Sequence, residues 1–217
     1  MLFLLPTGAT AVSAPLANEN CSRDPLIYMY EMSLELIIGP MFSGKTKALL
    51  KRVRELEKTP GNEVLCITHM SDDRYSSDGD IVSHDGDTRP AHAVRDLMSF
   101  VSHPLFRDAT HIAIEEAQFF HDLTPFVRLS TDVHNKHIVC AGLDGDFMRD
   151  PFGQVMELVP LCDSIQKLKA HCSGCSDPYT AIFSARVRGH GSEQVLVGST
   201  DIYKPMCREH YLEYYYR

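Results

Sequence analysis

The 217-residue chain contains no tryptophan, and none of its apolar runs approaches the roughly 18 residues that a membrane-spanning helix needs. It also lacks an excess of positive charge, because 21 Lys and Arg stand against 29 Asp and Glu and give a net charge of −8. Neutralising a nucleic-acid backbone requires clustered cations, so this balance argues against a nucleic-acid partner. We therefore expect neither a membrane nor a nucleic acid among its partners.

The composition supplies enough apolar residues for a buried core, with 44% hydrophobic and 23% charged residues. The seven cysteines are odd in number and scattered, which does not resemble a disulfide framework. Cys66 and Cys140 lie inside apolar runs and are expected to be core thiols, which favours a reducing, cytoplasmic location. The stretch Met1–Ala14 has no basic start and is broken by Pro6, so we do not expect a secretory signal.

Strand and helix patterns alternate through most of the chain. Residues 1–32 show no periodicity and are predicted to form a disordered extension. Four strand-like runs separated by helical stretches predict an α/β fold, with a mostly parallel sheet covered on both faces. The strands are expected at 34–38, 64–68, 111–115 and 138–143, the helices at 46–58, 93–101 and 125–133, and a long polar loop at 71–90.

After about residue 145 the pattern changes to short β-rich segments punctuated by glycine, proline and cysteine. These segments are expected at 155–158, 165–171, 180–186 and 194–197. We therefore predict an α/β domain over 33–150 and a small β-rich lobe over 151–217.

One octapeptide matches the pattern G-x-x-x-x-G-K-[ST], and it consists of Gly39, Pro40, Met41, Phe42, Ser43, Gly44, Lys45 and Thr46. It follows an apolar strand and opens a Lys-rich helix, which is the context of a P-loop. In a P-loop, backbone N–H groups and the helix N-terminus hold the phosphates, the lysine reaches the β and γ oxygens, and the hydroxyl ligates Mg²⁺. The first domain is therefore predicted to be a P-loop NTPase-type nucleotide-binding domain.

Two acidic residues, Glu115 and Glu116, end the predicted strand at 111–115. Ligands of open parallel sheets bind at the carboxyl ends of the strands, so we expect both side chains at the nucleotide site. We assign Glu115 to Mg²⁺ or its bound water, and Glu116 to the general base that accepts a proton from an acceptor hydroxyl. The alternative is a solvated acidic start of a helix.

Two knuckles, one formed by Cys172 and Cys175 and the other by Cys207 and His210, offer three thiolates and one imidazole. This donor set is typical of a structural Zn²⁺ site, because four protein ligands leave no open coordination position. The alternative is four unrelated core or surface residues.

Taken together, these motifs resemble the cytosolic, zinc-containing (type II) thymidine kinase family. The resemblance covers 34–211, and the matching stretches occur in the family's order: GPMFSGKT at Gly39, DDRYSS at Asp72, SHD at Ser83, EEAQFF at Glu115, LDGDF-x-R-x-PFG at Leu143, LVPL at Leu158, C-x-x-C at Cys172 and VGSTDIYKPMCREHY at Val197. It implies transfer of the γ-phosphate of ATP to the 5′-hydroxyl of thymidine or deoxyuridine, which gives dTMP in nucleotide salvage for DNA synthesis.

The resemblance also implies residue roles. For ATP and Mg²⁺ it adds to the P-loop and Glu115 the residues Asp72, Asp73, Arg74 and Gln118. For the nucleoside it implies an apolar pocket and a lasso loop anchored by zinc, formed by Met41, Leu143, Phe147, Phe152, Thr180, Leu196, Val197, Gly198 and Tyr203. It further implies a homotetramer and feedback inhibition by dTTP.

Three positions depart from the family's pattern. The chain has Glu115 where the family usually has Asp, Ala117 where it usually has Gly, and His210 where the fourth zinc ligand is commonly Cys. The extra methylene of Glu115 is expected to shift the geometry around the metal or its water, whereas zinc accepts either Cys or His.

Other functions fit parts of the sequence. A P-loop GTPase or ATPase switch would explain the phosphate loop, and Asn135 and Lys136 resemble the start of the guanine-reading N-K-x-D motif, but Ile138 stands in the place of its Asp. A zinc-ribbon nucleic-acid binder conflicts with the acidic balance. Another nucleoside kinase, with deoxycytidine or a purine nucleoside as acceptor, is the alternative within the kinase class.

Overall fold

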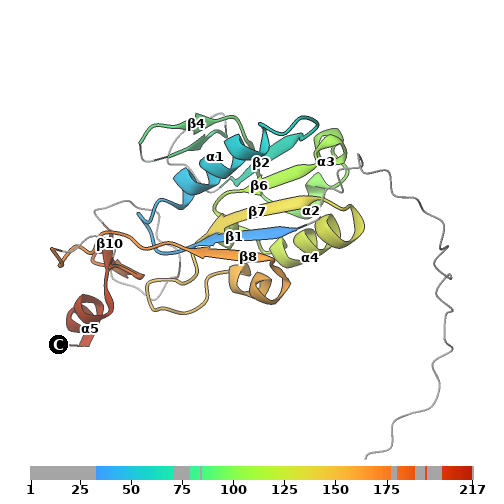
Figure 1. Cartoon of the computed structure of the whole chain (residues 1–217). Coiled ribbons are helices and arrows are strands. Elements are labelled where there is room, and N and C mark those ends of the chain that lie inside the picture. Colours follow the sequence, from blue (N-terminus) through green and yellow to red (C-terminus); the bar gives the residue numbers. More distant parts are fainter. Residues whose placement is uncertain are drawn as a thin grey trace, which may run out of the picture.

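The computed structural model describes residues 33–70, 79–83, 85–176, 180–188, 194 and 202–216. At its centre is one six-stranded sheet with the order β5-β2-β6-β7-β1-β8, in which every pairing is parallel. Figure 1 shows β2, β6, β7, β1 and β8 side by side in this order. The predicted α/β fold with a mostly parallel sheet is confirmed. Its strands are β1 Leu34–Ile38, β2 Val64–His69, β5 His92–Val94, β6 His111–Ile114, β7 His137–Gly142 and β8 Ser164–Lys167.

Alternation along the strands builds a separate core on each face of the sheet. In β1, Leu36 and Ile38 face one core and Ile37 faces the other, as the two-residue period of a strand requires. The Ile37 core is covered by α1 (Lys45–Leu56), and all four residues of the central strand β6 are buried. The opposite core is covered by α2 Leu97–Phe100, α3 Pro104–Asp108, the 3₁₀ turn η1 Ala117–Phe119, α4 Leu123–Arg128 with its π-helical continuation η2 Leu129–Val133, and the 3₁₀ helix η3 Val155–Leu161.

Two small antiparallel pairs lie outside the main sheet. β3 (Ile81–Val82) pairs with β4 (Thr88–Arg89), and β9 (Phe183–Arg186) pairs with β10 (Tyr203–Met206). The C-terminal helix α5 (Arg208–Tyr216) follows β10 directly, and Figure 1 shows both on the side of the molecule away from α4. The small β-rich part predicted near the C-terminus is therefore present as β9 and β10.

Two predicted elements are wrong, and the loop predicted over 71–90 contains the β3–β4 hairpin. The helix expected at 93–101 begins only at Leu97, because His92–Val94 forms the edge strand β5, which is too short to show a strand period. The segment 155–158 was expected to be β-rich but lies in the 3₁₀ helix η3, where Val155 and Leu158 are buried three residues apart on one face.

The predicted division of the chain at about residue 150 stays a prediction, and the structure adds one fact about it. β8 lies beyond that point in the sequence and is nevertheless an edge strand of the main sheet, parallel to β1. All four of its residues are exposed, so it has no apolar alternation by which the sequence could assign it. The extension predicted over 1–32 lies outside the described residues.

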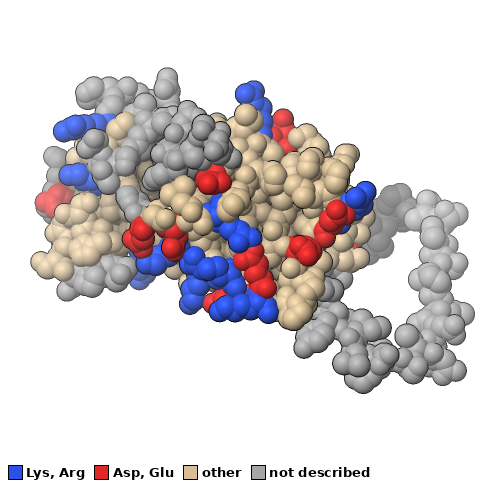
Figure 2. All heavy atoms as spheres, turned by 90° about the horizontal axis from the view of Figure 1, so that it is seen from above, with Lys and Arg blue, Asp and Glu red and all other residues tan. Residues whose placement is uncertain are grey.

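Charged residues on the outer side of α1 form mixed pairs. Figure 2 shows Lys and Arg atoms next to Asp and Glu atoms on the face seen from above. The pairs are Lys47 with Asp85, Lys51 with Glu55, Arg52 with Glu35, and Arg54 with Asp87. This paired surface differs from the uniform basic stripe that a nucleic-acid backbone requires. Among the described residues, no helix is both long enough and apolar enough to span a bilayer.

Candidate active site

The phosphate loop connects β1 to α1 through unusual backbone angles. Gly44 has φ 83° and Phe42 has φ 63°, both in the left-handed region. At Gly39 the constraint is space, because a Cβ there would lie 2.6 Å from the carbonyl oxygen of Leu168. The loop thus turns directly into α1, whose first residue is Lys45, and presents the helix N-terminus at the end of β1.

The two polar side chains that begin α1 already have defined partners. The Nζ of Lys45 donates to the carbonyl oxygen of Pro40 at 2.9 Å, so the amine lies over the loop. The Oγ1 of Thr46 donates to Oε1 of Glu115 at 2.5 Å, which joins the loop to the end of β6. Glu115 is only 5% exposed. A hydroxyl and a carboxylate in contact offer hard oxygen ligands, so Thr46 and Glu115 fit a bound Mg²⁺.

Glu116 adopts a backbone conformation that residues with side chains rarely take, with φ 51° and ψ 41°. Such outliers persist where the surrounding structure holds them, and they cluster at functional sites. Gln118 is 3% exposed, and its Nε2 donates to Oε2 of Glu116 at 2.5 Å. Its Oε1 accepts from the backbone N–H of Leu143 at 3.0 Å. Gln118 therefore connects the Glu116 carboxylate to the end of β7.

The predicted nucleoside residues after β7, Leu143, Phe147 and Phe152, are buried. Phe152 packs edge-on against Phe119, with 5.6 Å between ring centroids. The guanidinium of Arg186 lies 3.8 Å from the centroid of the Phe147 ring and donates to the Tyr203 hydroxyl at 3.0 Å. Arg186 thus brings together two residues that the resemblance assigns to the nucleoside. Leu143 follows β7 directly.

Sequence reasoning missed Arg186 and Ser184. Ser184 accepts the backbone N–H of Met41 at 2.9 Å, which ties the phosphate loop to β9. Both residues are buried and stand two apart in β9, so they share one face of the strand. That spacing is the one available signal, and it points to no particular chemistry without the fold.

The other predicted site residues fall in two groups. Thr180 precedes Ala181, which packs in one apolar cluster with Cys172, Cys175 and Cys207, so Thr180 lies beside the metal-donor cluster. Its predicted role at the nucleoside stays a prediction. Outside the described residues lie Asp72, Asp73, Arg74, Leu196, Val197 and Gly198.

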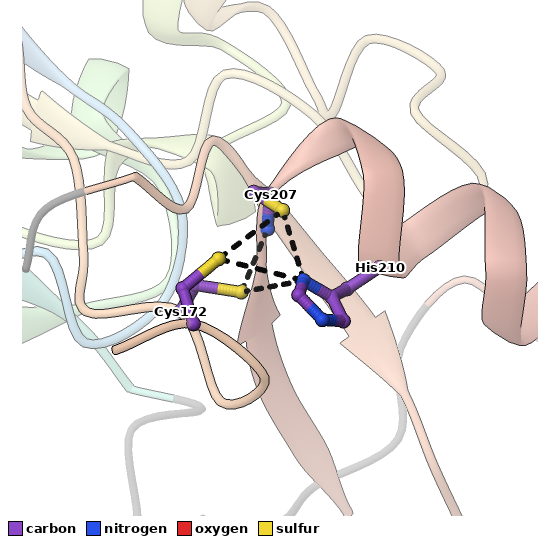
Figure 3. A group of neighbouring side chains, drawn as sticks. Cys172, Cys207 and His210 are labelled. Carbon is purple, nitrogen blue, oxygen red and sulfur yellow. Dashed lines mark hydrogen bonds between the residues drawn. The ribbon is translucent and has the colours of Figure 1, made fainter. Parts of the chain in front are cut away.

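The four predicted metal donors, Cys172, Cys175, Cys207 and His210, form one cluster with donor atoms within 4.8 Å of one another. The Sγ of Cys175 lies 3.7 Å from that of Cys207, and Nδ1 of His210 lies 3.1 to 3.7 Å from the three sulfurs. Bonds of about 2.3 Å to sulfur and 2.1 Å to nitrogen give tetrahedral edges of about 3.5 to 3.8 Å, which these separations approach. Figure 3 shows His210 and the cysteine sulfurs turned toward one another.

Local features of the cluster also suit a metal. Burial opposes ionisation of Cys172, but N–H groups of Cys207 and Gly174 donate to its sulfur and lower its pKa to about 6. The thiolate is the form that binds metal. A Cβ at Gly174 would lie 2.4 Å from the His210 ring, so glycine allows the imidazole to approach. The cluster therefore fits zinc in both geometry and donor chemistry.

Gly153 provides a test of how tightly the site is packed. A Cβ at Gly153 would lie 2.1 Å from the carbonyl oxygen of Gln118, whereas one at Gly86 would meet nothing within 4 Å. Both glycines have positive φ, 56° and 85°. We expect Gly86→Ala to cost about 1 kcal/mol of unfolding free energy, as left-handed backbone strain alone does. Gly153→Ala should cost at least about 2 kcal/mol more, because the Gln118 backbone must move. Denaturant unfolding measures both, and equal losses would contradict this account.

Comparison with known proteins agrees with this geometry. The family model for thymidine kinase matches residues 32–211. A "Thymidine kinase" of Oryza sativa subsp. japonica is 40% identical over 187 residues, covering 85% of this chain and 68% of that protein. "Thymidine kinase a" of Arabidopsis thaliana is 39% identical over 183 residues, covering 83% of this chain and 75% of that protein. Since the matched region contains the phosphate loop, both carboxylates and all four metal donors, the chain belongs to the thymidine kinase family.

Proposed function

We propose that this chain transfers the γ-phosphate of ATP to the 5′-hydroxyl of thymidine, and also of deoxyuridine, and so supplies dTMP for salvage toward DNA synthesis. Membership in the thymidine kinase family supports the thymidine acceptor. The observation that carries the mechanism is the bridge made by Gln118 between the Glu116 carboxylate and the Leu143 backbone. This bridge links a proton acceptor to the residues proposed to hold the nucleoside, next to a phosphate loop.

Binding of the triphosphate is assigned to the loop Gly39–Thr46. Its backbone N–H groups and the N-terminus of α1 contact phosphate oxygens, and the Lys45 amine exchanges the Pro40 carbonyl for the β and γ oxygens. Thr46 and Glu115 would hold Mg²⁺, together with the implied carboxylates Asp72 and Asp73, and the implied Arg74 would contact phosphate oxygens of ATP. When bound, Mg²⁺ would supply positive charge that offsets the negative charge of the phosphates.

Proton transfer is assigned to Glu116. A primary alcohol has a pKa of roughly 15, so the 5′-hydroxyl is not deprotonated in advance at neutral pH. Glu116 accepts the proton as the oxygen forms its bond to the γ-phosphorus and the bond from that phosphorus to the β–γ bridging oxygen breaks, which releases ADP. Gln118 donates to this carboxylate and keeps it oriented. Lys45 counters charge on the transferred group.

Recognition of the base is assigned to the apolar residues Met41, Leu143, Phe147 and Phe152, with Tyr203 from β10. A thymine ring and its 5-methyl group suit a small apolar pocket with few fixed polar groups. The contact of Arg186 with both Phe147 and Tyr203 supports their joint action. Thr180 and the lasso residues Leu196, Val197 and Gly198 are retained as proposed contacts.

A guanine-reading switch is not supported. Lys136 is 5% exposed, and its amine donates to the carbonyl of Ala109 at 2.6 Å. The Lys136 amine therefore caps the carboxyl end of α3 and is not available to bind a nucleotide. Another nucleoside kinase remains an outcome of the following experiment.

The test is phosphate transfer from labelled ATP to a panel of nucleosides, with water as the control acceptor. We expect phosphorylation of thymidine and deoxyuridine. Glu116→Gln should lower kcat by roughly 10²- to 10⁴-fold and leave ATP binding intact, because only proton acceptance is lost. Glu63→Gln makes the same charge change at an exposed position before β2 and should leave kcat unchanged. Turnover with water alone would indicate an NTPase, and preference for deoxycytidine or a purine nucleoside would indicate a different kinase.

We also propose that Cys172, Cys175, Cys207 and His210 bind one structural zinc ion. The purified chain should contain one zinc, and Cys172→Ser should lose it and lower the melting temperature by roughly 5 °C or more, because metal binding adds to folding free energy. His210→Cys keeps a suitable donor and should retain zinc. Elemental analysis and thermal unfolding measure both effects. A melting temperature unaffected by a strong chelator would rule the site out.

We further propose a cytoplasmic homotetramer inhibited by dTTP. The exposed edge strand β8, with Ile165 43% exposed, supports association because a second copy would cover it. The free cysteines Cys66, Cys140 and Cys162 are consistent with a reducing compartment. Light scattering should give four times the 24.4-kDa chain mass.

Added dTTP should raise the KM for thymidine, because dTTP combines a thymine base with a triphosphate and would compete for the same site. A monomeric mass, or an unchanged KM, would contradict the respective proposal.

A further inference from the structure

Tyr211 occupies a special position on the C-terminal helix. Within α5, whose burial is described from end to end of 208–216, Tyr211 is the single buried residue at 1% exposure, whereas Tyr214 and Tyr216 are 49% and 67% exposed. It follows the metal donor His210 directly, and its backbone N–H donates to the carbonyl of Cys207 at 3.0 Å. Tyr211 therefore belongs to the same helical turn as two of the four metal donors.

The side chain of Tyr211 reaches away from this turn toward the nucleoside residues. Its hydroxyl donates to the backbone carbonyl of Phe147 at 2.6 Å, across 64 positions of sequence. The ring is held by Phe183 and Tyr215, with centroids 5.0 and 4.6 Å away, and the Arg149 guanidinium lies 4.7 Å above it. These contacts on the ring leave the hydroxyl a fixed direction.

Phe147 lies in an irregular segment after β7, so no strand or helix holds its backbone. Its ring is contacted by Arg186 from β9, and its carbonyl is held by Tyr211 from α5. A buried carbonyl that loses its hydrogen-bond partner costs free energy unless the backbone moves to find another. Loss of the Tyr211 hydroxyl would therefore shift Phe147 without removing any atom of the pocket.

We propose that Tyr211 is a positioning residue for the nucleoside: by holding the Phe147 backbone, it makes thymidine binding depend on the metal-binding turn Cys207–His210. The inference rests on the proposed function for the identity of the nucleoside and for the contact of Phe147 with its base. The metal-donor cluster thus gains a role beyond stability, because it fixes the turn that carries Tyr211, and the Tyr211 hydroxyl fixes the backbone of Phe147.

The kinetic test is Tyr211→Phe, which removes one oxygen and keeps the ring. We expect the KM for thymidine to rise about 5- to 10-fold, as loss of one buried hydrogen bond does, with kcat and the KM for ATP within about 2-fold. The matched control is Tyr214→Phe on the same helix, whose exposed hydroxyl donates to the Val187 carbonyl at 3.3 Å. It should leave all three constants within about 2-fold. An unchanged thymidine KM, or an equal rise for ATP, would overturn the proposal.

A second measurement, hydrogen exchange, does not require activity. Amides of residues 143–152 should exchange faster in Tyr211→Phe than in the wild type, with α1 unchanged as the internal reference. In the wild type, removal of zinc by a chelator should accelerate the same amides, and in Tyr211→Phe it should add little, because the two perturbations share one route. If the amides of 143–152 kept their protection from exchange after chelation of the wild type, the proposal would be contradicted, even if the variant failed to fold. An inactive wild type would defeat the proposed function while exchange still reported on this contact.

Discussion

The parallel arrangement of the central sheet is the constraint on which the site depends. Because β1, β6 and β7 are neighbours and run in one direction, their carboxyl ends meet at one edge. The next residues after these strands are Gly39, Glu115 and Leu143, which begin the phosphate loop, the carboxylate pair and the segment 143–152, which contains three of the proposed nucleoside residues. Reversal or slippage of one strand would separate groups that the proposed transfer needs within a few ångströms.

Around Gln118 the packing leaves little room for change. Its two amide atoms are committed to Glu116 and Leu143, and its backbone carbonyl faces Gly153. Gly142 also approaches, since a Cβ there would lie 3.0 Å from Oε1 of Gln118. Gly142 and Gly153, which flank the segment 143–152, thus both leave room for Gln118. The orientation of the Glu116 carboxylate therefore depends on this backbone packing as well as on the hydrogen bond from Gln118.

Local motifs could be predicted from the sequence, and tertiary contacts could not. Adjacent residues or short spacings were enough to predict the phosphate loop, the Glu115 and Glu116 pair and the four metal donors. The structure brings the four donors together and joins the loop to Glu115 through Thr46. Arg186 could not be predicted in this way, because its importance rests on its contacts with Phe147 and Tyr203, which lie far apart in the sequence. The edge strand β5 was missed because its three residues are too few to show a strand period, and η3 was missed because the three-residue spacing of Val155 and Leu158 was interpreted as a β-rich segment.

The charges around the phosphate loop also depend on the fold. Residues 39–54 contain five cations and no acid, so the sequence alone indicates a positive segment suited to a triphosphate. In the fold, four of these five cations are paired with acids from β1, α1 and the β3–β4 hairpin. Only Lys45 lies over the loop itself, on the Pro40 carbonyl. At the proposed phosphate site, Lys45, the backbone N–H groups of the loop and the N-terminus of α1 would therefore supply the local positive potential, although the net charge of the chain is negative.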